Sequence, residues 1–284
     1  MRRLCALLLA APLVVSCTRL VQPTTPAPRP HYVLGAPYRL GGIWHYPHEQ
    51  YGATLTGLAI VTHAAHPKLT ANGETFDPGA LAVASRTIQL PAIGRLTDLE
   101  TGRQVLVRVN DRGPAQVRRL IAVTPRVGSV LGFPPDGIAR VRLEVLAGES
   151  HDDADSLPGA PHLAIAAAPR EAVLAESLDA PTHTAAPVAA PAAIAPPRAL
   201  SAQVTQVSPE PGSLYVRLSR FTNRRYAAQQ AGRISEPAEV ARLDDLDGAG
   251  YRARLGPFAT IADADSALDR ALRAGVTDAR IVVE

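Results

Sequence analysis

Residues 96–109, Leu-Thr-Asp-Leu-Glu-Thr-Gly-Arg-Gln-Val-Leu-Val-Arg-Val, contain the clearest strand and turn pattern of this chain. Glu100-Thr101-Gly102 is a turn signal, and the segment after it alternates, with a valine at every second position from Val105. Residues 138–146 alternate in the same way, with apolar side chains inward and charged ones outward. Short strands and tight turns of this kind continue from about residue 57 and predict a small β-barrel.

Composition argues against one large core. The chain has 284 residues, of which 46% are hydrophobic, but only 4% are aromatic and 26 are prolines. Much of the apolar content is alanine beside proline, which buries little surface, so we expect small domains separated by extended chain. The net charge is only +3, and the arginines are spread along the chain. A nucleic-acid partner is not expected, because the concentrated basic surface of such proteins is absent.

The N-terminus has the pattern of an export signal. Arg2-Arg3 precede a short apolar run, which ends at Ser16-Cys17 and is too short to span a bilayer stably. The segment before Cys17 resembles the bacterial lipobox. That resemblance implies that residues 1–16 are removed, that Cys17 is lipidated, and that Thr18 favours the outer membrane. The alternative is an ordinary signal peptide with a chance cysteine. Because Cys5 would leave with the signal, we expect no disulfide.

The rest of the chain divides into four parts. Residues 17–31 read as a polar tether, residues 32–148 as the barrel domain, and residues 149–211 as an Ala/Pro-rich linker that is disordered or partly extended. Residues 212–284 hold a weak repeat, in which a strand beginning near Tyr215 or Tyr251 leads into a helix. A last strand near the end completes a small α+β domain, a sheet backed by two helices.

Two segments resemble signature blocks of the rare lipoprotein A family: Thr-Ala-Asn-Gly-Glu-Thr-Phe-Asp at 70–77 and Arg-Val-Asn-Asp-Arg-Gly-Pro at 108–114. Gly41-Gly42 and Trp44 add to a resemblance that covers about residues 30–146. It implies a mainly β chain with a six-stranded double-psi β-barrel, and a lytic transglycosylase acting on peptidoglycan strands without stem peptides. Residues 212–284 resemble the sporulation-related repeat (SPOR) domain, which binds such denuded glycans at division sites.

The resemblance also implies catalytic residues. Glu74 matches the family's essential glutamate, which would protonate the glycosidic oxygen and then deprotonate the muramyl 6-hydroxyl that closes a 1,6-anhydro ring. Asp77 and Asp111 match two further acids, and a second carboxylate can raise the pKa of the first and stabilise positive charge. Thr70, Asn72 and Arg112, from the same two blocks, are expected to contact glycan.

Simpler interpretations exist for these acids, and the chain departs from the family pattern. Asn72-Gly73 is a turn signal, and Asp111 could cap the loop before Gly113-Pro114. Ser85 occupies the position of a family histidine, and serine does not titrate near neutral pH. Residues 60–63 lack the family's Ser-Trp-Tyr-Gly, and residues 121–124 lack its Ile-Asp-Leu-Ser. His63 or His66 could replace the missing imidazole, or both could be solvated loop residues.

In the C-terminal segment, strand alternation separates Leu214, Val216 and Leu218 from Tyr215, Arg217 and Ser219. SPOR domains bind glycan on the open face of the sheet. Arg217, Arg220 and Arg254 are therefore expected to bind sugar hydroxyls and lactyl carboxylates, with Tyr251 stacking on a ring. The alternative is an ordinary solvated sheet edge.

The sequence thus predicts a lytic transglycosylase on the periplasmic face of the outer membrane, held by its lipid anchor and recruited to the division septum. We expect a monomer without metal or other cofactor, because the eight histidines show no usual ligand spacing. Denuded glycan and the membrane are the expected partners, and septal division proteins are further candidates. The alternatives are a glycan-binding scaffold that has lost activity and a wall-loosening binder similar to expansins.

Overall fold

The computed structural model describes residues 27–62, 68–161, 200–237, 239–246 and 250–284. The expected signal peptide, Cys17, His63, His66 and most of the Ala/Pro-rich segment lie outside these ranges. Within them, none of the helices combines the length and the apolar character needed to cross a membrane.

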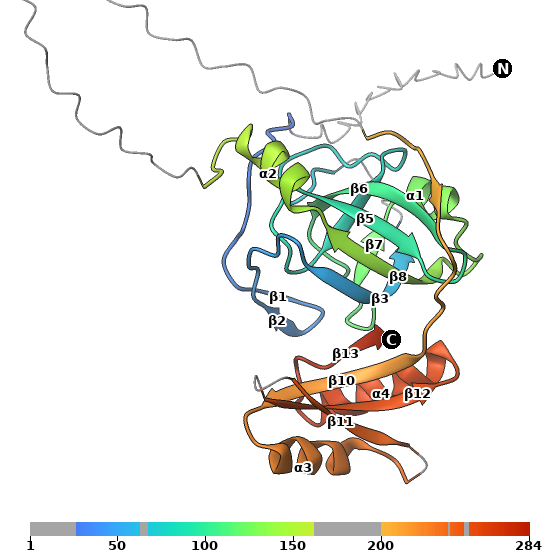
Figure 1. The fold of residues 1–284 in the computed structure, drawn as a ribbon. Coiled ribbons are helices and arrows are strands. Elements are labelled where there is room, and N and C mark those ends of the chain that lie inside the picture. Colours follow the sequence, from blue (N-terminus) through green and yellow to red (C-terminus); the bar gives the residue numbers. More distant parts are fainter. Residues whose placement is uncertain (1–26, 63–67, 162–199, 238, 247–249) are drawn as a thin grey trace, which may run out of the picture.

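Six strands close into the barrel of the N-terminal half (Figure 1). In spatial order, β4 pairs with β7, β7 with β3, β3 with β8, β8 with β5 and β5 with β6, and a parallel β4–β6 pairing closes the ring. The strands are β3 (Thr54–Val61), β4 (Ala82–Ser85), β5 (Ala92–Asp98), β6 (Arg103–Asp111), β7 (Ile121–Val123) and β8 (Ile138–Val145). This arrangement confirms the predicted mainly β fold with a six-stranded barrel.

The side chains that alternate along β8 and β6, as predicted, form the core of the barrel. Every second residue of β8 from Ala139 to Val145 is buried, as are Val105, Val107 and Val109 of β6. Gly102 ends the β5–β6 turn with a φ of +74°, a conformation that glycine adopts at little cost. These apolar side chains belong to one continuous core inside the barrel.

The barrel extends into the expected linker. Helix α2 (Ala147–Asp155) follows β8 directly, so residue 149 lies inside a helix instead of beginning a disordered segment. The Ser150 hydroxyl fixes this helix on β5, because it accepts from Ile93 N at 2.9 Å and donates to Ile93 O at 3.1 Å. At the other end of the range, β9 (Thr205–Gln206) pairs with β6.

A two-stranded hairpin covers one side of the barrel. Strands β1 (Tyr38–Leu40) and β2 (Ile43–His45) pair antiparallel across the turn Gly41-Gly42. A side chain at Gly41 would place its Cβ 2.2 Å from the carbonyl oxygen of Ala115, so only glycine permits this close contact. The other short helix of this half is α1 (Pro125–Leu131).

The C-terminal segment is the expected α+β unit. Its antiparallel sheet has the order β11-β12-β10-β13, and two helices cover one face (Figure 1). The elements are β10 (Leu214–Phe221), α3 (Arg224–Ile234), β11 (Ala241–Asp245), β12 (Tyr251–Phe258), α4 (Ile261–Arg273) and β13 (Arg280–Val283). The sequence did not indicate β11, because this edge strand offers only Leu243 to the core under the helices.

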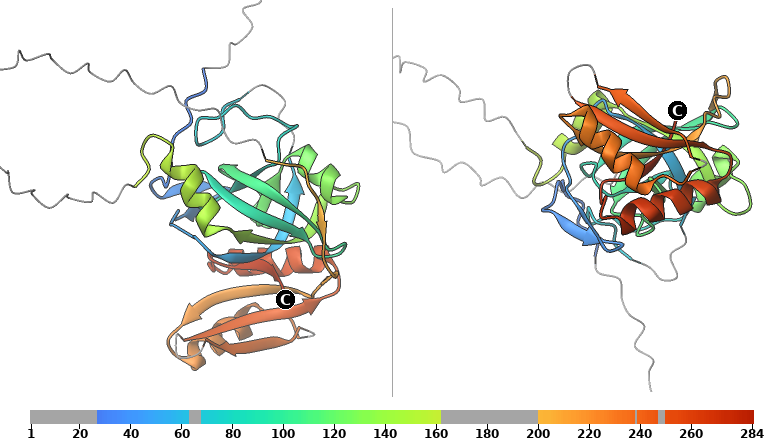
Figure 2. Two further views of the ribbon diagram at one scale, coloured as in Figure 1. Left: turned by 45° about the horizontal axis from the view of Figure 1, so that its top comes forward. Right: turned by 90° about the horizontal axis from the view of Figure 1, so that it is seen from below.

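The C-terminal unit packs directly on the barrel, as Figure 1 and the left view of Figure 2 show. The outer edge of β13 faces β3, where Val283 N lies 3.4 Å from Thr56 Oγ1. Arg119 of the barrel forms an ion pair with Asp265 of α4 through bonds of 2.8 and 3.0 Å. Leu58 of β3 is fully buried in the core of the C-terminal unit. The two units therefore share packed apolar surface as well as charged contacts.

Candidate active site

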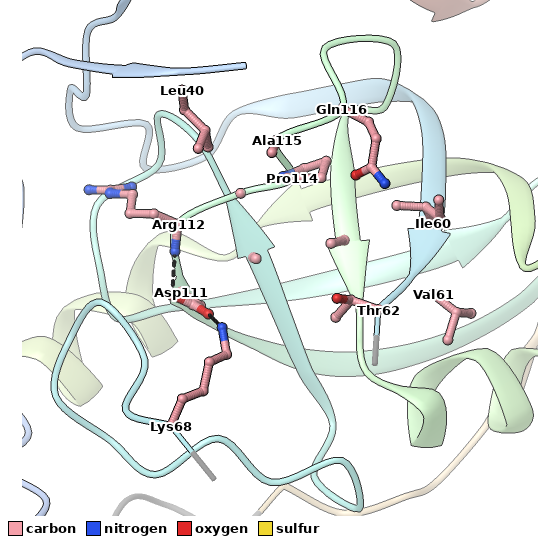
Figure 3. Close-up of a pocket in the computed structure, with 13 residues that line it drawn as sticks. Leu40, Ile60, Val61, Thr62, Lys68, Asp111, Arg112, Pro114, Ala115 and Gln116 are labelled. Atoms are coloured by element: carbon pink, nitrogen blue, oxygen red, sulfur yellow. Dashed lines mark hydrogen bonds and ion pairs between the residues drawn. The ribbon is translucent and has the colours of Figure 1, made fainter. Parts of the chain in front are cut away.

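A pocket of about 270 Å³ opens at the end of β6 (Figure 3). The ends of β3, β4 and β7, the loop after β6 and strand β1 form its walls. Its lining residues are Leu40, Ile60, Val61, Thr62, Lys68, Ala84, Asp111, Arg112, Gly113, Pro114, Ala115, Gln116 and Ala122. Among the three acids that the sequence selected, Asp111 is the one on this lining.

Asp111 is held through both carboxylate oxygens. Oδ1 accepts hydrogen bonds from the backbone N–H groups of Ala71 at 2.9 Å and Arg112 at 2.8 Å. Oδ2 pairs with Lys68 Nζ at 2.7 Å. The Asp111 side chain is 15% exposed, whereas that of Lys68 is 49% exposed. The protein backbone thus fixes one oxygen, and a flexible, half-exposed side chain covers the other.

Glu74 lies in a different environment, because its carboxylate is buried and surrounded by donors. Oε1 accepts from Asn72 Nδ2 and from Arg108 Nη2, each at 2.7 Å, and Oε2 accepts from Asn110 Nδ2 at 2.8 Å. Arg108 Nε adds contacts of 2.9 and 3.2 Å to the two oxygens. Each of these partners donates a proton, so the site is complementary to a carboxylate and not to a carboxylic acid.

These donors decide the protonation state of Glu74. Burial acts to raise the pKa of Glu74, but the hydrogen bonds and charge of Arg108, followed by the hydrogen bonds of Asn110 and Asn72, outweigh it and lower the pKa. Glu74 is therefore ionised at neutral pH. This differs from the raised pKa that the sequence led us to expect for a general acid.

Arg108 connects Glu74 to helix α2. In addition to its contacts with Glu74, its guanidinium pairs with Asp153, and all three side chains are nearly inaccessible. Its two carboxylate neighbours raise the pKa of Arg108, although burial opposes that shift. One buried cation thus pairs with two buried anions and ties the loop 70–74 to β6 and α2.

Thr70 and Asn72 were expected to contact glycan, but the structure buries both side chains within the same turn as Glu74. Thr70 Oγ1 donates to Asn72 Oδ1 at 2.7 Å and accepts from Glu74 N at 3.1 Å. Arg112 also makes internal bonds, including one of 2.7 Å from Nη2 to the carbonyl oxygen of Leu34. These residues hold the protein's own loops in place.

Asp77 and Ser85 both lie off the pocket lining. Asp77 is exposed, and its Oδ1 accepts from Gly79 N at 2.8 Å, a turn-capping contact before β4. Ser85 is buried, and the adjacent Ala84 lines the pocket. Because neighbouring side chains of a strand point to opposite faces, the Ser85 side chain is directed away from the pocket.

The open face of the C-terminal sheet carries a row of four arginines. Arg242, Arg254, Arg217 and Arg280 occupy paired register positions across β11, β12, β10 and β13. Like charges directly opposite one another destabilise a sheet. Glu284 relieves part of this repulsion by pairing with both Arg217 and Arg254, the two central members.

The two remaining candidates lie further along the same strands. Arg220 is exposed and pairs in register with Arg252, whose pKa is lowered by burial and by the charge of Arg217. Tyr251 pairs in register with Phe221, whose ring lies 6.5 Å from that of Tyr226 on α3. Tyr251 is therefore on the helix side of the sheet, where it cannot stack on a sugar bound beside Arg217.

Sequence reasoning missed Lys68, Arg108, Asn110 and Asp153. A usable signal was present for two of them. Arg108 and Asn110 are two residues apart on β6, so they share the face opposite the buried valines. An arginine beside an asparagine at that position indicates a buried anion. Asp153 gave no such signal, because only the fold brings α2 to β6.

Comparisons with known proteins agree with this architecture. Residues 59–143 match a family model described as a lytic transglycolase. A protein of Pseudomonas aeruginosa strain UCBPP-PA14, named endolytic peptidoglycan transglycosylase RlpA, is 30% identical over 249 residues, which cover 81% of this chain and 72% of that protein. The proteins of the same name from Rickettsia felis and Campylobacter jejuni are 34% and 37% identical over 42% and 43% of this chain.

The matched regions cover 54% of the Rickettsia felis protein and 45% of the Campylobacter jejuni protein, about half of their lengths. The Pseudomonas relative, in contrast, is matched across barrel and C-terminal unit together, since the alignment covers 81% of this chain. The resemblance carried by residues 70–77 and 108–114 is thereby confirmed, and the chain belongs to the RlpA family.

Proposed function

We propose that the barrel is a peptidoglycan lytic transglycosylase and that its reaction takes place at Asp111. The observation that carries this proposal is the position of Asp111. It lies in the pocket, with one oxygen fixed by two backbone N–H groups and the other paired, among the described residues, with the half-exposed Lys68. The substrate would be glycan strands without stem peptides, as the family resemblance implies.

In the proposed reaction, a sugar entering the pocket displaces Lys68 from Oδ2 of Asp111. Once Lys68 has left, Oδ2 takes up a proton from solvent. The resulting carboxyl group protonates the glycosidic oxygen as the bond from that oxygen to the anomeric carbon breaks. The resulting carboxylate then stabilises the positive charge and accepts the proton of the muramyl 6-hydroxyl, whose oxygen closes the 1,6-anhydro ring. The proton returns to the group that supplied it, so no water is consumed.

Glu74 has a positioning role in this scheme, in place of the acid and base role that the sequence suggested. Its ionised carboxylate holds Asn72 and Asn110, which are close in sequence to Ala71 and Asp111. The Ala71 N–H and Asp111 therefore depend on the Glu74–Arg108 pair for their relative placement.

For residues 212–284 we propose a SPOR-like glycan-binding role on the arginine row. Support comes from Arg217 and Arg254, which already bind a carboxylate, that of Glu284. A muramyl lactyl group presents the same chemistry. Together with a lipid anchor at Cys17, this binding would recruit a monomer to septal glycan on the periplasmic face of the outer membrane.

The second candidate is a glycan-binding protein whose barrel has lost activity. Two observations favour it: Ser85 occupies the family's histidine position, and the low pKa of Glu74 leaves no proton for it to donate at neutral pH. This candidate requires binding to glycan without any cleavage.

The deciding experiment uses protein without residues 1–17 and amidase-treated, peptide-free peptidoglycan. Mass spectrometry of the products should reveal 1,6-anhydro-muramyl ends that are lost in Asp111→Asn. Sedimentation with the same glycan measures binding in parallel. Absence of anhydro ends with intact sedimentation would reject the transglycosylase and leave the binding protein.

A further inference from the structure

The hairpin β1–β2 carries two strongly exposed aromatic side chains. Trp44 on β2 is 57% exposed, and Tyr46 just beyond it is 63% exposed. Trp44 is also the only tryptophan of the chain. Neither ring contributes to a core cluster among the described residues, so folding of the barrel does not explain their presence.

The hairpin has an inner and an outer face. On the inner face, Leu40 lines the pocket, and the Tyr38 hydroxyl donates to Arg86 O at 2.9 Å. On the outer face, Arg39 is the register partner of Trp44. One strand pair therefore presents a pocket wall on one side and an indole beside a guanidinium on the other.

The position of the hairpin relative to the pocket is fixed. The turn at Gly41 contacts Ala115, and Ala115 and Leu40 both line the pocket. Figure 3 shows these two residues at the end of the pocket lining opposite Lys68. The outer face thus lies across the hairpin from the pocket, at the end away from Lys68.

A polymeric substrate must continue beyond this pocket. A volume of about 270 Å³ lies at or below the lower end for sites that enclose a small ligand, so most of a glycan strand lies on the protein surface. Cleavage within a strand also requires sugar on both sides of the broken bond. The part of the strand on one side of the broken bond would leave the pocket over the hairpin.

The chemistry of the outer face matches that substrate. The apolar C–H face of a sugar ring stacks on an indole, and a guanidinium binds a carboxylate with paired hydrogen bonds. Arg39 is exposed, and in the described part of the chain it takes part in none of the ion pairs. Its Nε donates to the carbonyl oxygen of Gly42 at 3.1 Å, which leaves the charge of the guanidinium available to a ligand.

We propose that Arg39, Trp44 and Tyr46 form a sugar-binding subsite that holds the glycan strand where it leaves the pocket. Trp44 stacks on a sugar ring, and Arg39 binds the lactyl carboxylate of a muramyl residue. This inference rests on the proposed function, because it takes its substrate class from it.

Trp44 itself reports on the proposal, because intrinsic tryptophan fluorescence arises from this residue alone. We would titrate peptide-free glycan oligosaccharides into the Asp111→Asn chain, which binds without turnover. A saturable blue shift of the emission is expected as a sugar covers the indole. Sedimentation of glycan with an unchanged emission spectrum would overturn the proposal.

Kinetics of the otherwise native sequence give a second test. Trp44→Ala should raise KM about tenfold, which corresponds to about 1.4 kcal/mol, with little change in kcat, since the stacking contact lies outside the pocket. Trp44→Phe should recover most of the loss. Tyr226→Ala is the matched control, because Tyr226 on α3 is also 57% exposed, and it should leave KM unchanged.

Two further measurements separate the possible occupants and the two proposals. An emission shift with phosphatidylglycerol vesicles but not with glycan would overturn the subsite in favour of a membrane surface. A shift that follows protein concentration alone would overturn it in favour of a second copy of the chain. Anhydro products with an unaltered KM in Trp44→Ala would reject the subsite and leave the transglycosylase. A glycan-induced emission shift without anhydro products from any variant would reject the transglycosylase and leave the subsite.

Discussion

Arg108 Nη2 lies 2.7 Å from Glu74 Oε1, and the two side chains are only 7% and 6% exposed. An ion pair at this depth loses its solvation on both sides, so each partner depends on the other. Since Arg108 also pairs with Asp153, its guanidinium is the single cation of a buried triad. Several properties of the protein depend on this arrangement.

Removing the guanidinium should destabilise the fold strongly. Arg108→Met leaves two buried carboxylates without their cation, and we expect the free energy of unfolding to fall by about 3–5 kcal/mol. Urea denaturation followed by circular dichroism measures this change. Arg95→Met is the control, because the side chains of the Arg95–Glu144 pair are 43% and 30% exposed and the pair should contribute less than about 1 kcal/mol. Equal effects of the two substitutions would contradict the triad.

Glu74 should make stability depend on acid pH. Its folded-state pKa lies below the ordinary value of 4.5, so its contribution is complete above that pH and is lost as the pH falls through the lowered pKa. In Glu74→Gln, the free energy of unfolding should be smaller at neutral pH and should fall less steeply in acid. Urea denaturation at a series of pH values tests the slopes. Identical slopes in both proteins would show that Glu74 is not held ionised.

Asp111 and Asp77 should differ in their effect on activity. Asp111→Asn removes the proposed acid and base, and we expect the rate of anhydro-end formation to drop about 10²–10⁴-fold. Asp77→Asn alters an exposed turn cap, so its effect should stay below about tenfold, with a loss of stability of at most about 1 kcal/mol. Mass spectrometry of timed digests gives both rates. A larger loss of activity in Asp77→Asn than in Asp111→Asn would show that the reaction takes place at the turn before β4 and not in the pocket.

Glu284 should compete with glycan for Arg217 and Arg254. Glu284→Gln removes the carboxylate that Arg217 and Arg254 share, although Arg254 Nε still pairs with Asp244 Oδ1 at 3.2 Å. Because ion pairs near the surface contribute at most about 1 kcal/mol, glycan should sediment about two- to fivefold more tightly. Binding should also weaken with salt. Glu144→Gln is a suitable control, since Glu144 is 30% exposed in its barrel ion pair and Glu284 is 27% exposed. Weaker binding by Glu284→Gln would contradict the competition.

Periodicity predicted the regular parts of this fold. The alternating valines of β6 and the repeated strand–helix pattern of the C-terminal unit are local signals, and both elements form as expected. Helix α2 was not predicted, because its residues show no apolar stripe. It is fixed instead by Ser150 and Asp153, which contact residues more than forty positions away.

The candidate site also combines features that local sequence predicts with features that depend on distant contacts. The motif residues Glu74 and Asp111 could be selected from the sequence, but their environments could not. Glu74 is ionised because Arg108 and Asn110 reach it from β6, 34 and 36 residues further along the chain. The expected role of Tyr251 failed for a related reason, since its face of the sheet follows from its register with β10.

The edge contact between β13 and β3 has a consequence for the products. Because packed apolar surface and the Arg119–Asp265 pair join the two units, the arginine row and Asp111 keep a constant separation. A glycan strand held at the row would then be cut at a set number of sugars from its point of attachment. The joined units would act as a molecular ruler, and the fragments they release would cluster around one length instead of following a random distribution.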